Sequence, residues 1–457
     1  MIERHSRKSV IDLTVLMFVF VGVCVFRAPH VLLRGRYWAE EGSLWWNHAR
    51  NTGFFGHLKY VVPGNGYLSL NANLQTQIAS WLPTRIGPLF TSWTSLLGMF
   101  LPAFVLFVIP RKIFRSRSEV IMIASLVLFA SPVMEPDVFA NSINLQTFLA
   151  ISLAILILAD WNKLSSRHVY FLVLPVQLLA ILSGSYGLVT GMACLAIGFV
   201  RFTTHQKHEG GRSLDTSMIA FLVASLVAIV VQAGVFINGL LEHGVRPERA
   251  RHPLPNVHNF LSFFASNLTT VFVSRSESDH LFERLTMDFG TALMWTVPFL
   301  ILTASCVRPA LRVRRLHGES WNFRAALLCS PSFAPVLLLV LYMLTAILTL
   351  YGYASPIPNT RYQVVASLVL LLCIVAAIDQ NLQGAFRWVS LGLAIIAGLG
   401  VGITSFRDDP WTYLSCGRSC VSWEDQVIEA KQLVRTEYVF WPMHSDPRFT
   451  APVLGVD

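Results

Sequence analysis

The sequence predicts an all-α polytopic membrane protein with about eleven transmembrane helices, an inside N-terminus and an outside C-terminus. Hydrophobic residues make up 54% of the 457 positions and charged residues only 13%. The apolar residues gather in runs of about 17 to 25, the length that crosses a bilayer. Basic residues lie mainly between alternate pairs of runs, as the positive-inside rule requires. The net charge of +9 is therefore explained by basic loops that orient the chain in the membrane, and it does not indicate a nucleic-acid partner.

The predicted spans begin near residues 10, 89, 119, 144, 169, 187, 217, 287, 332, 362 and 388. The first apolar run, residues 10–33, is too long for the core of a signal peptide, so we expect it to be retained. Loops after the even-numbered spans are basic or nearly so, whereas the short outward turns hold one basic residue, Arg361. This asymmetry gives the orientation. The spans between residues 119 and 203 are the shortest, and a count that differs there by one helix pair fits the same pattern.

Three segments are predicted to be large and outward-facing: residues 34–88, 239–286 and 406–457. The last of them is expected to form a small outer tail after a transmembrane domain of residues 1–405. In the first outer loop, leucine or isoleucine recurs every four residues from Leu70 to Leu82, and asparagine and glutamine fill other faces. This pattern predicts an amphipathic helix that lies flat in the membrane interface.

Two of the seven cysteines, Cys416 and Cys420, lie in the polar C-terminal tail. Their spacing suits a small disulfide loop if the tail lies in an oxidising compartment. Two free thiols are the alternative, and two ligands are too few for a zinc site. The other five cysteines lie in or beside apolar runs, where they pack as small hydrophobic residues.

Glu40 and Glu41 form an acidic pair about seven residues beyond the first span. Two adjacent carboxylates repel each other, and the aromatic residues around them raise the cost of ionising both. One of the pair is therefore a candidate general base. The alternative is that both are solvated, pair with Arg34 and Arg36, and begin the following helix, since acids are favoured in a first helical turn.

Four arginines are candidates for binding an anion at the outer face. Arg27 lies within the first span, and Arg361 lies where an outer turn enters the tenth span. A guanidinium binds a phosphate through two parallel hydrogen bonds, whereas the alternative role for both is to anchor a helix end at the interface. Arg246 and Arg249 belong to a basic cluster in the second large loop, which suits a lipid head group or an anionic glycan unless the loop is simply solvated.

Glu135 and Asp137 are the acids of a short outward turn, and Asn144 follows at the start of the next span. Polar residues that enter the membrane often line a cavity, although helix capping would also account for them. The sequence contains no Walker loop, dinucleotide fingerprint or nucleophile elbow, and its histidines lack the close spacing of a helical metal site. Nucleotide-driven classes are therefore disfavoured.

Residues 37–83, which include Glu40, Glu41, Gly42 and the later Gly66–Leu68, resemble the first outer loops of GT-C glycosyltransferases. These polytopic enzymes use polyprenyl-phosphate-linked sugars at the outer membrane face. The "NTRY" before the tenth span and the "VFWPM" of the tail are also similar to segments of that family. The resemblance implies that Glu41, or failing it Glu40, is the base. It also implies that Arg361 with Tyr362, and Arg27, contact the donor phosphate, and that Tyr67 lines the acceptor cavity.

The same resemblance implies an enzyme of the bacterial cytoplasmic membrane that contacts membrane lipids and transfers a sugar to a glycan or lipid-linked acceptor of the cell envelope. A divalent metal is compatible with this chemistry but not required by it. The chain departs from the family at the acidic pair, where an Asp commonly occupies one position. A lipid-linked glycan flippase or transporter, an O-antigen polymerase or ligase, and a scaffolding membrane protein are the alternatives.

Overall fold

The structure is a computed structural model. It describes residues 2–27, 29–35, 37–38, 40–62, 66–108, 139–159, 164–208, 216–243, 257–272, 288–317, 333–352, 360–404, 423–432, 436–439 and 450–452. The described chain is mostly helical, with one short two-stranded sheet.

The first half of the chain forms α1 (Ile2–Arg27), α2 (Pro29–Leu33), η1 (Glu41–Trp46), α3 (Asn47–Asn51), α4 (Phe54–Leu58), α5 (Leu70–Trp81), α6 (Gly87–Val108), α8 (Leu145–Ile157), α9 (Ser166–His168), η4 (Val169–Val173), α10 (Leu174–Ile181), α11 (Ser185–His208) and α12 (Thr216–His243). The second half forms α14 (Val257–Phe272), α16 (Phe289–Met294), α17 (Thr296–His317), α19 (Ala334–Gly352), α20 (Thr360–Asn381), α21 (Gly384–Thr404), α22 (Trp423–Lys431), β1 (Glu437–Val439) and β2 (Thr450–Pro452).

Four of the described helices are long and apolar enough to cross a membrane: Gly87–Val108, Met218–Gly239, Gly290–Arg312 and Gln363–Asn381. Five further apolar helices are shorter. Each predicted span that falls on described residues overlaps a helix, and the span expected near residue 119 lies outside them. Apolar side chains cover the outer faces of several helices, as with Val223 and Val230 of α12. Such wide exposed apolar faces are typical of helices that contact lipid.

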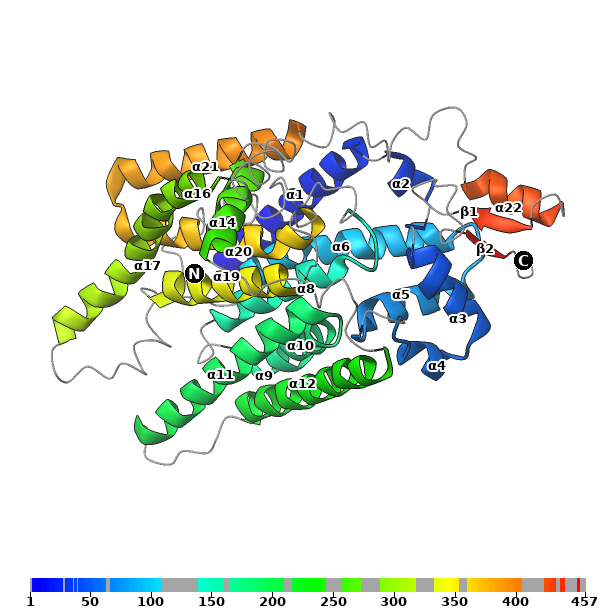
Figure 1. Cartoon of the computed structure of the whole chain (residues 1–457), viewed down its shortest axis with the longest axis horizontal. Helices are drawn as coiled ribbons and strands as arrows, with labels where there is room; N and C mark the ends of the chain where they lie inside the picture. The colour runs from blue at the N-terminus through cyan, green and yellow to red at the C-terminus, as the bar shows by residue number, and fades with distance from the viewer. Residues whose placement is uncertain are drawn as a thin grey trace.

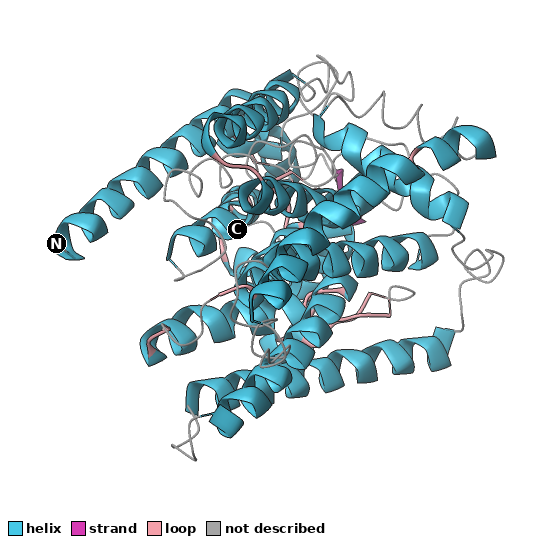
Figure 2. Ribbon diagram, turned by 90° about the vertical axis from the view of Figure 1, so that its left-hand side faces the viewer, coloured by secondary structure: helices cyan, strands magenta, loops and turns pink. Residues whose placement is uncertain are grey.

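The contacts between helices define two groups within the largely helical molecule that Figure 2 shows. In the first group α8 packs against α6, α10 and α11, and in the second α20 packs against α14, α17 and α19. α20 also packs against α8, and its residues from Val364 to Leu372 are buried throughout. α20 is mostly apolar and buried on all sides, so it lies within the bundle, where its few polar residues, such as Gln363, bond to neighbouring helices.

Residues 257–272, expected within a large outer loop, form α14, which packs against α19, α20 and α21. Its polar side chains share one face and bond to those neighbours. Ser266 donates to Gln363 Oε1 at 3.1 Å, and Asn267 donates from Nδ2 to the hydroxyl of Tyr342 at 3.2 Å. The serines, threonines and asparagines lower the hydropathy of the segment, which explains why a search for apolar runs does not find this helix.

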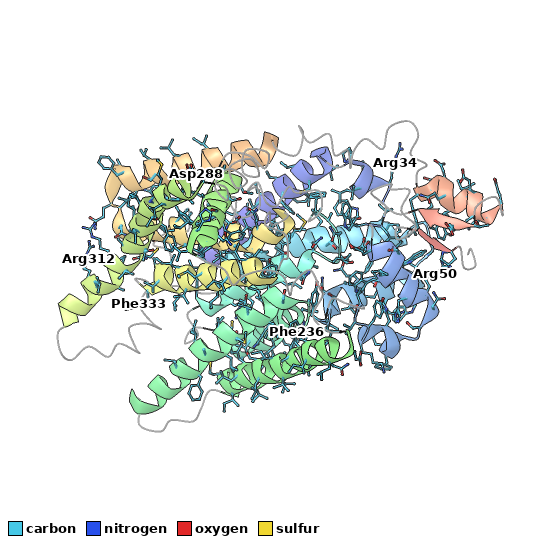
Figure 3. The ribbon with its side chains drawn as sticks, viewed as in Figure 1. Arg34, Arg50, Phe236, Asp288, Arg312 and Phe333 are labelled. Atoms are coloured by element: carbon cyan, nitrogen blue, oxygen red, sulfur yellow. The ribbon has the colours of Figure 1, made fainter. Side chains whose placement is uncertain are left out.

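The elements of residues 34–88, predicted to be the first outer loop, and the described elements of the C-terminal tail lie together at one end of the long axis (Figure 1). The described part of the tail consists of α22 and an antiparallel ladder in which Glu437 of β1 pairs with Pro452 of β2. Arg50 of α3 lies at this end, and Arg312 of α17 lies at the opposite end (Figure 3). The first outer loop and the tail therefore share one surface.

Candidate functional site

Two glycines bring the start of the first outer loop against α6. Gly35 has a φ of +69°, which L side chains rarely adopt, and a Cβ there would lie 2.8 Å from the backbone nitrogen of Leu89. A Cβ on Gly87 would lie 2.2 Å from the hydroxyl oxygen of Tyr37. The chain therefore turns sharply after α2 and passes directly over the beginning of α6.

Glu41 begins η1, a single turn of π-helix, and its side chain points into the protein with 1% of its surface exposed. Oε2 accepts a hydrogen bond from the backbone N–H of Trp38 at 3.1 Å. Oε1 accepts another from the backbone N–H of Ser142 at 2.8 Å. π-helical turns inside longer helices frequently occur at functional sites. The two amides fix the carboxyl group in one orientation.

The Ser142 amide is presented by a turn at residues 139–144, directly before α8. Ala140 in this turn has a φ of +46°, the only positive value for a residue other than glycine among those described. Such a conformation is costly for alanine and is often found where a structure has a special requirement. Asn71 of α5 donates from Nδ2 to the carbonyl of Ser142 at 2.5 Å, and Asn141 accepts from the amide of Asn144 at 2.9 Å. These contacts hold the turn against α5.

The pKa of Glu41 is raised above its usual range because burial removes the carboxylate from water. Hydrogen bonds from Ser142, Trp38 and Thr91 partly oppose this effect by favouring the ionised form. Glu40 lies before the helical turn, is only half-buried, and makes no capping hydrogen bond with its side chain. The geometry therefore distinguishes the two acids, and Glu41 is the one with a defined environment.

α5 occupies the residues where the four-residue repeat predicts a helix, and its amide side chains face the protein. Asn71, Asn73, Gln75 and Gln77 are all buried, whereas Trp81 at the end of the helix is exposed. The Oε1 atom of Gln75 accepts from two hydroxyls of α6. The Oδ1 atoms of Asn71 and Asn73 have no hydrogen-bond partner in the structure. The amides of α5 thus bond to different neighbours: Asn71 to the turn of Ser142, Asn73 to the carbonyls of Leu58 and Tyr60, and Gln75 to α6.

Two histidines, His48 of α3 and His57 of α4, form a pair beside α5. Their Nδ1 atoms, in His48 and His57, are 2.9 Å apart, and His57 Nε2 lies 2.9 Å from Thr76 Oγ1. Because Thr76 donates its own proton to the carbonyl of Ala72 at 2.7 Å, it accepts from His57 Nε2. His57 Nδ1 then accepts from His48. Burial, followed by the neighbouring His48, lowers the pKa of His57 to about 4, so this pair is neutral at pH 7.

The structure describes some of the other residues predicted for the site only in part. Arg27 ends α1, and Arg361 and Tyr362 lie in the first turn of α20, where the backbone alone is described. Asn144 precedes α8 and is joined to the Ser142 turn, and Tyr67 is half-buried. The remaining candidates lie outside the described residues: Glu135, Asp137, Arg246, Arg249, Cys416 and Cys420.

Comparison with other proteins does not extend this description. No family model, curated protein or solved structure matches the chain. The site is therefore interpreted from its own geometry.

Glu41 combines burial, fixed hydrogen-bond donors on both carboxyl oxygens and a raised pKa, which are properties expected of a general base. A carboxyl group with a raised pKa takes up a proton more readily near neutral pH, and fixed donors keep it oriented. Among the described residues there is no cluster of three or more histidine, cysteine or acidic side chains that would hold a metal ion. The sequence singles out Glu41 as a candidate but gives no sign of Trp38 and Ser142, because the backbone amides that bind the carboxyl group are not revealed by residue type.

Proposed function

We propose that the chain is a multi-pass glycosyltransferase of the bacterial cytoplasmic membrane. It moves a sugar from a polyprenyl-phosphate donor to a glycan or lipid-linked acceptor on the outer face. The observation that carries this proposal is the buried carboxylate of Glu41, oriented by two backbone amides in the first outer loop. The wide apolar faces of the helices support a membrane location.

In this mechanism Glu41 accepts the proton of the acceptor hydroxyl as the oxygen attacks the anomeric carbon of the sugar. A carbon–oxygen bond forms to the acceptor, the bond from carbon to the phosphate oxygen breaks, and polyprenyl phosphate leaves with its electron pair. The amides of Trp38 and Ser142 hold the carboxylate, and burial raises its pKa toward the working pH. Glu40, which is half-buried, is not required as a base.

The departing phosphate needs positive charge to stabilise it. We assign this role to Arg361, with Tyr362 beside it, and to Arg27 at the end of the first span. The backbone places all three at helix ends, Arg27 at the last residue of α1 and the other two at the start of α20. Two arginines neutralise a monophosphate without a metal ion, although a divalent cation is compatible with the same chemistry.

A lipid-linked glycan flippase or transporter is the second candidate. The observation in its favour is the polar network of Asn267, Gln363 and Tyr342 between α14, α19 and α20. Polar side chains inside a helix bundle of a membrane protein often mark a path for a solute. An O-antigen polymerase or ligase would instead rely on arginines such as Arg246 and Arg249.

The deciding experiment measures the transfer of labelled sugar from a panel of polyprenyl-phosphate sugars in purified membranes. Glu41→Gln keeps the size of the side chain but removes the base, so we expect transfer to fall by about two orders of magnitude or more. Glu40→Gln is the matched control and should stay within a few-fold of wild type. Equal activity in all three proteins would contradict the assignment of Glu41, and wild-type membranes that flip a lipid-linked glycan without transfer would favour the transporter.

A further inference from the structure

An aromatic cluster joins the C-terminal tail to both ends of η1. It consists of Tyr37, Trp46, Trp423 and Tyr438, each of which is at most 2% exposed. The ring of Trp423 lies 5.4 Å from that of Tyr37 and 5.8 Å from that of Trp46, both edge to face. Tyr438 of β1 lies 5.0 Å from Trp423. Aromatic pairs at these distances stabilise by about 0.5 to 1.5 kcal/mol each beyond the area that they bury.

The tail is also fixed to the connection between α5 and α6. Trp423 donates from Nε1 to the carbonyl of Thr84 at 2.8 Å, across 339 positions of the chain. Beside it, Arg85 forms an ion pair with Glu424 at 2.5 Å, which contributes little because both side chains are largely exposed to solvent. The buried indole and its hydrogen bond therefore carry most of the attachment.

These contacts lead directly to the carboxylate. Tyr37, which packs against Trp423, precedes Trp38, whose amide binds Glu41 Oε2. Trp46, which contacts both Trp423 and the ring of Tyr37, is the last residue of the π-helical turn that Glu41 begins. The tail thus holds the two ends of the segment on which the burial and orientation of Glu41 depend.

We propose that the C-terminal segment from α22 to β1 positions Glu41, with Trp423 as the positioning residue. Its ring fixes Tyr37 and Trp46, which in turn keep η1 packed against α5 and the Ser142 turn. The catalytic meaning of this inference rests on the proposed function, but the effect on the carboxyl group does not. Removing Trp423 should loosen η1 and let water reach Glu41.

The protonation of Glu41 reports on this contact because burial is the main influence on its pKa. α5 and α6 carry no ionisable side chain. Among the described residues, the ionisable groups near the turn include Glu40, the phenols of Tyr37 and Tyr438, and His48 and Arg50 of α3. Since burial is the largest cause of the raised pKa of Glu41, rehydration should move that pKa down toward its usual range.

The test measures how fast a hydrophobic carbodiimide modifies Glu41 as a function of pH, by mass spectrometry of the purified full chain. This reagent reacts with the protonated carboxyl group, so the midpoint of the curve follows the pKa. All variants are made in a protein that carries Glu40→Gln, so that Glu41 is the one remaining carboxyl group of the acidic pair that the reagent can modify. Trp423→Ala should lower the midpoint by about half a unit or more. Trp423→Phe, which retains the ring contacts, should restore most of it.

Ile428→Ala is the control, because Ile428 lies on the same helix and is 46% exposed; its midpoint should equal that of the background. Should Trp423→Ala fail to fold, Trp423→Leu replaces it, since leucine keeps an apolar side chain but removes the ring contacts and the N–H. A folded variant with an unchanged midpoint would overturn the inference. Where wild type transfers sugar, kcat should fall about tenfold with KM little changed, and the acidic limb of the pH profile should move with the midpoint. The carbodiimide result stands even if no transfer is found.

Discussion

Glu41 accepts a hydrogen bond at 2.8 Å from the backbone amide of Ser142, a residue 101 positions further along the chain. This contact joins the first outer loop to the turn before α8. It also gives the carboxylate a donor that a side-chain substitution does not remove.

Ser142→Pro should remove this donor, whereas Ser142→Ala keeps it. The ionised form of Glu41 then loses a hydrogen bond, so its pKa should rise further, and the acidic limb of the pH–rate profile should move to higher pH. Loss of the buried bond should also cost about 1 to 3 kcal/mol of stability. The measurement is the pH profile of both variants beside wild type. Identical profiles for proline and alanine would show that the amide does not act on Glu41.

Ala140→Gly should stabilise the protein, since glycine adopts the positive φ of this residue without steric cost. Relief of the strained conformation outweighs the greater freedom of glycine in the unfolded chain, and the net gain should be about 0.5 to 1 kcal/mol. Thermal unfolding in detergent measures it. Ala150→Gly is the contrasting substitution. Ala150 lies inside α8, so replacing it with glycine should lower the stability of the protein by about 1 kcal/mol. A loss of stability at both positions would argue against strain at Ala140.

The protein should lose stability as the pH falls from about 6.5 to about 4, in part through His57. The unfolded chain binds a proton to this histidine below its ordinary pKa of about 6.5. The folded protein does so only near the lowered pKa of about 4. Within that window the unfolded state binds more protons, so acid favours unfolding. His57→Gln should flatten this part of the stability curve, which thermal unfolding as a function of pH measures, and an unchanged curve would contradict the assignment to His57.

Gly187→Ala should be severely destabilising. An added Cβ would lie 1.7 Å from the carbonyl oxygen of Ala180, so the backbone of α10 or α11 must shift. The expected cost is about 3 kcal/mol. Gly234→Ala in α12 meets no atom within 4 Å and should instead stabilise that helix by about 0.5 to 1 kcal/mol. Unfolding temperatures of the two variants should therefore move in opposite directions.

Sequence patterns predict the helices that depend on apolar runs and on regular repeats. α6, α12, α17 and α20 are found this way because each contains a continuous apolar stretch of about spanning length. α14 is not, because its polar face bonds to other helices and gives no signal in a single sequence. The helix of residues 70–81 follows from its repeat, but the burial of Asn71 and Gln75 does not, since amides normally mark the solvent side of a helix.

The candidate site is predictable to a similar extent. The acidic pair is visible in the sequence, and the surrounding aromatic residues suggest a raised pKa. The choice of Glu41 over Glu40 requires the structure, because burial and backbone donors distinguish neighbouring residues of the same type. Trp423 lies far from the pair in the sequence, so nothing in its local surroundings links it to the first outer loop.

The hydrogen bond from Trp423 to Thr84 has a consequence for biosynthesis. Residues 37–46 are made early, but the aromatic side chain that closes on them is added 339 positions after Thr84. Until the ribosome has passed that point, η1 lacks its outer support. A chain released before Trp423 is made would carry the acidic pair without the tail that holds it, so the order of synthesis itself delays the completion of the site.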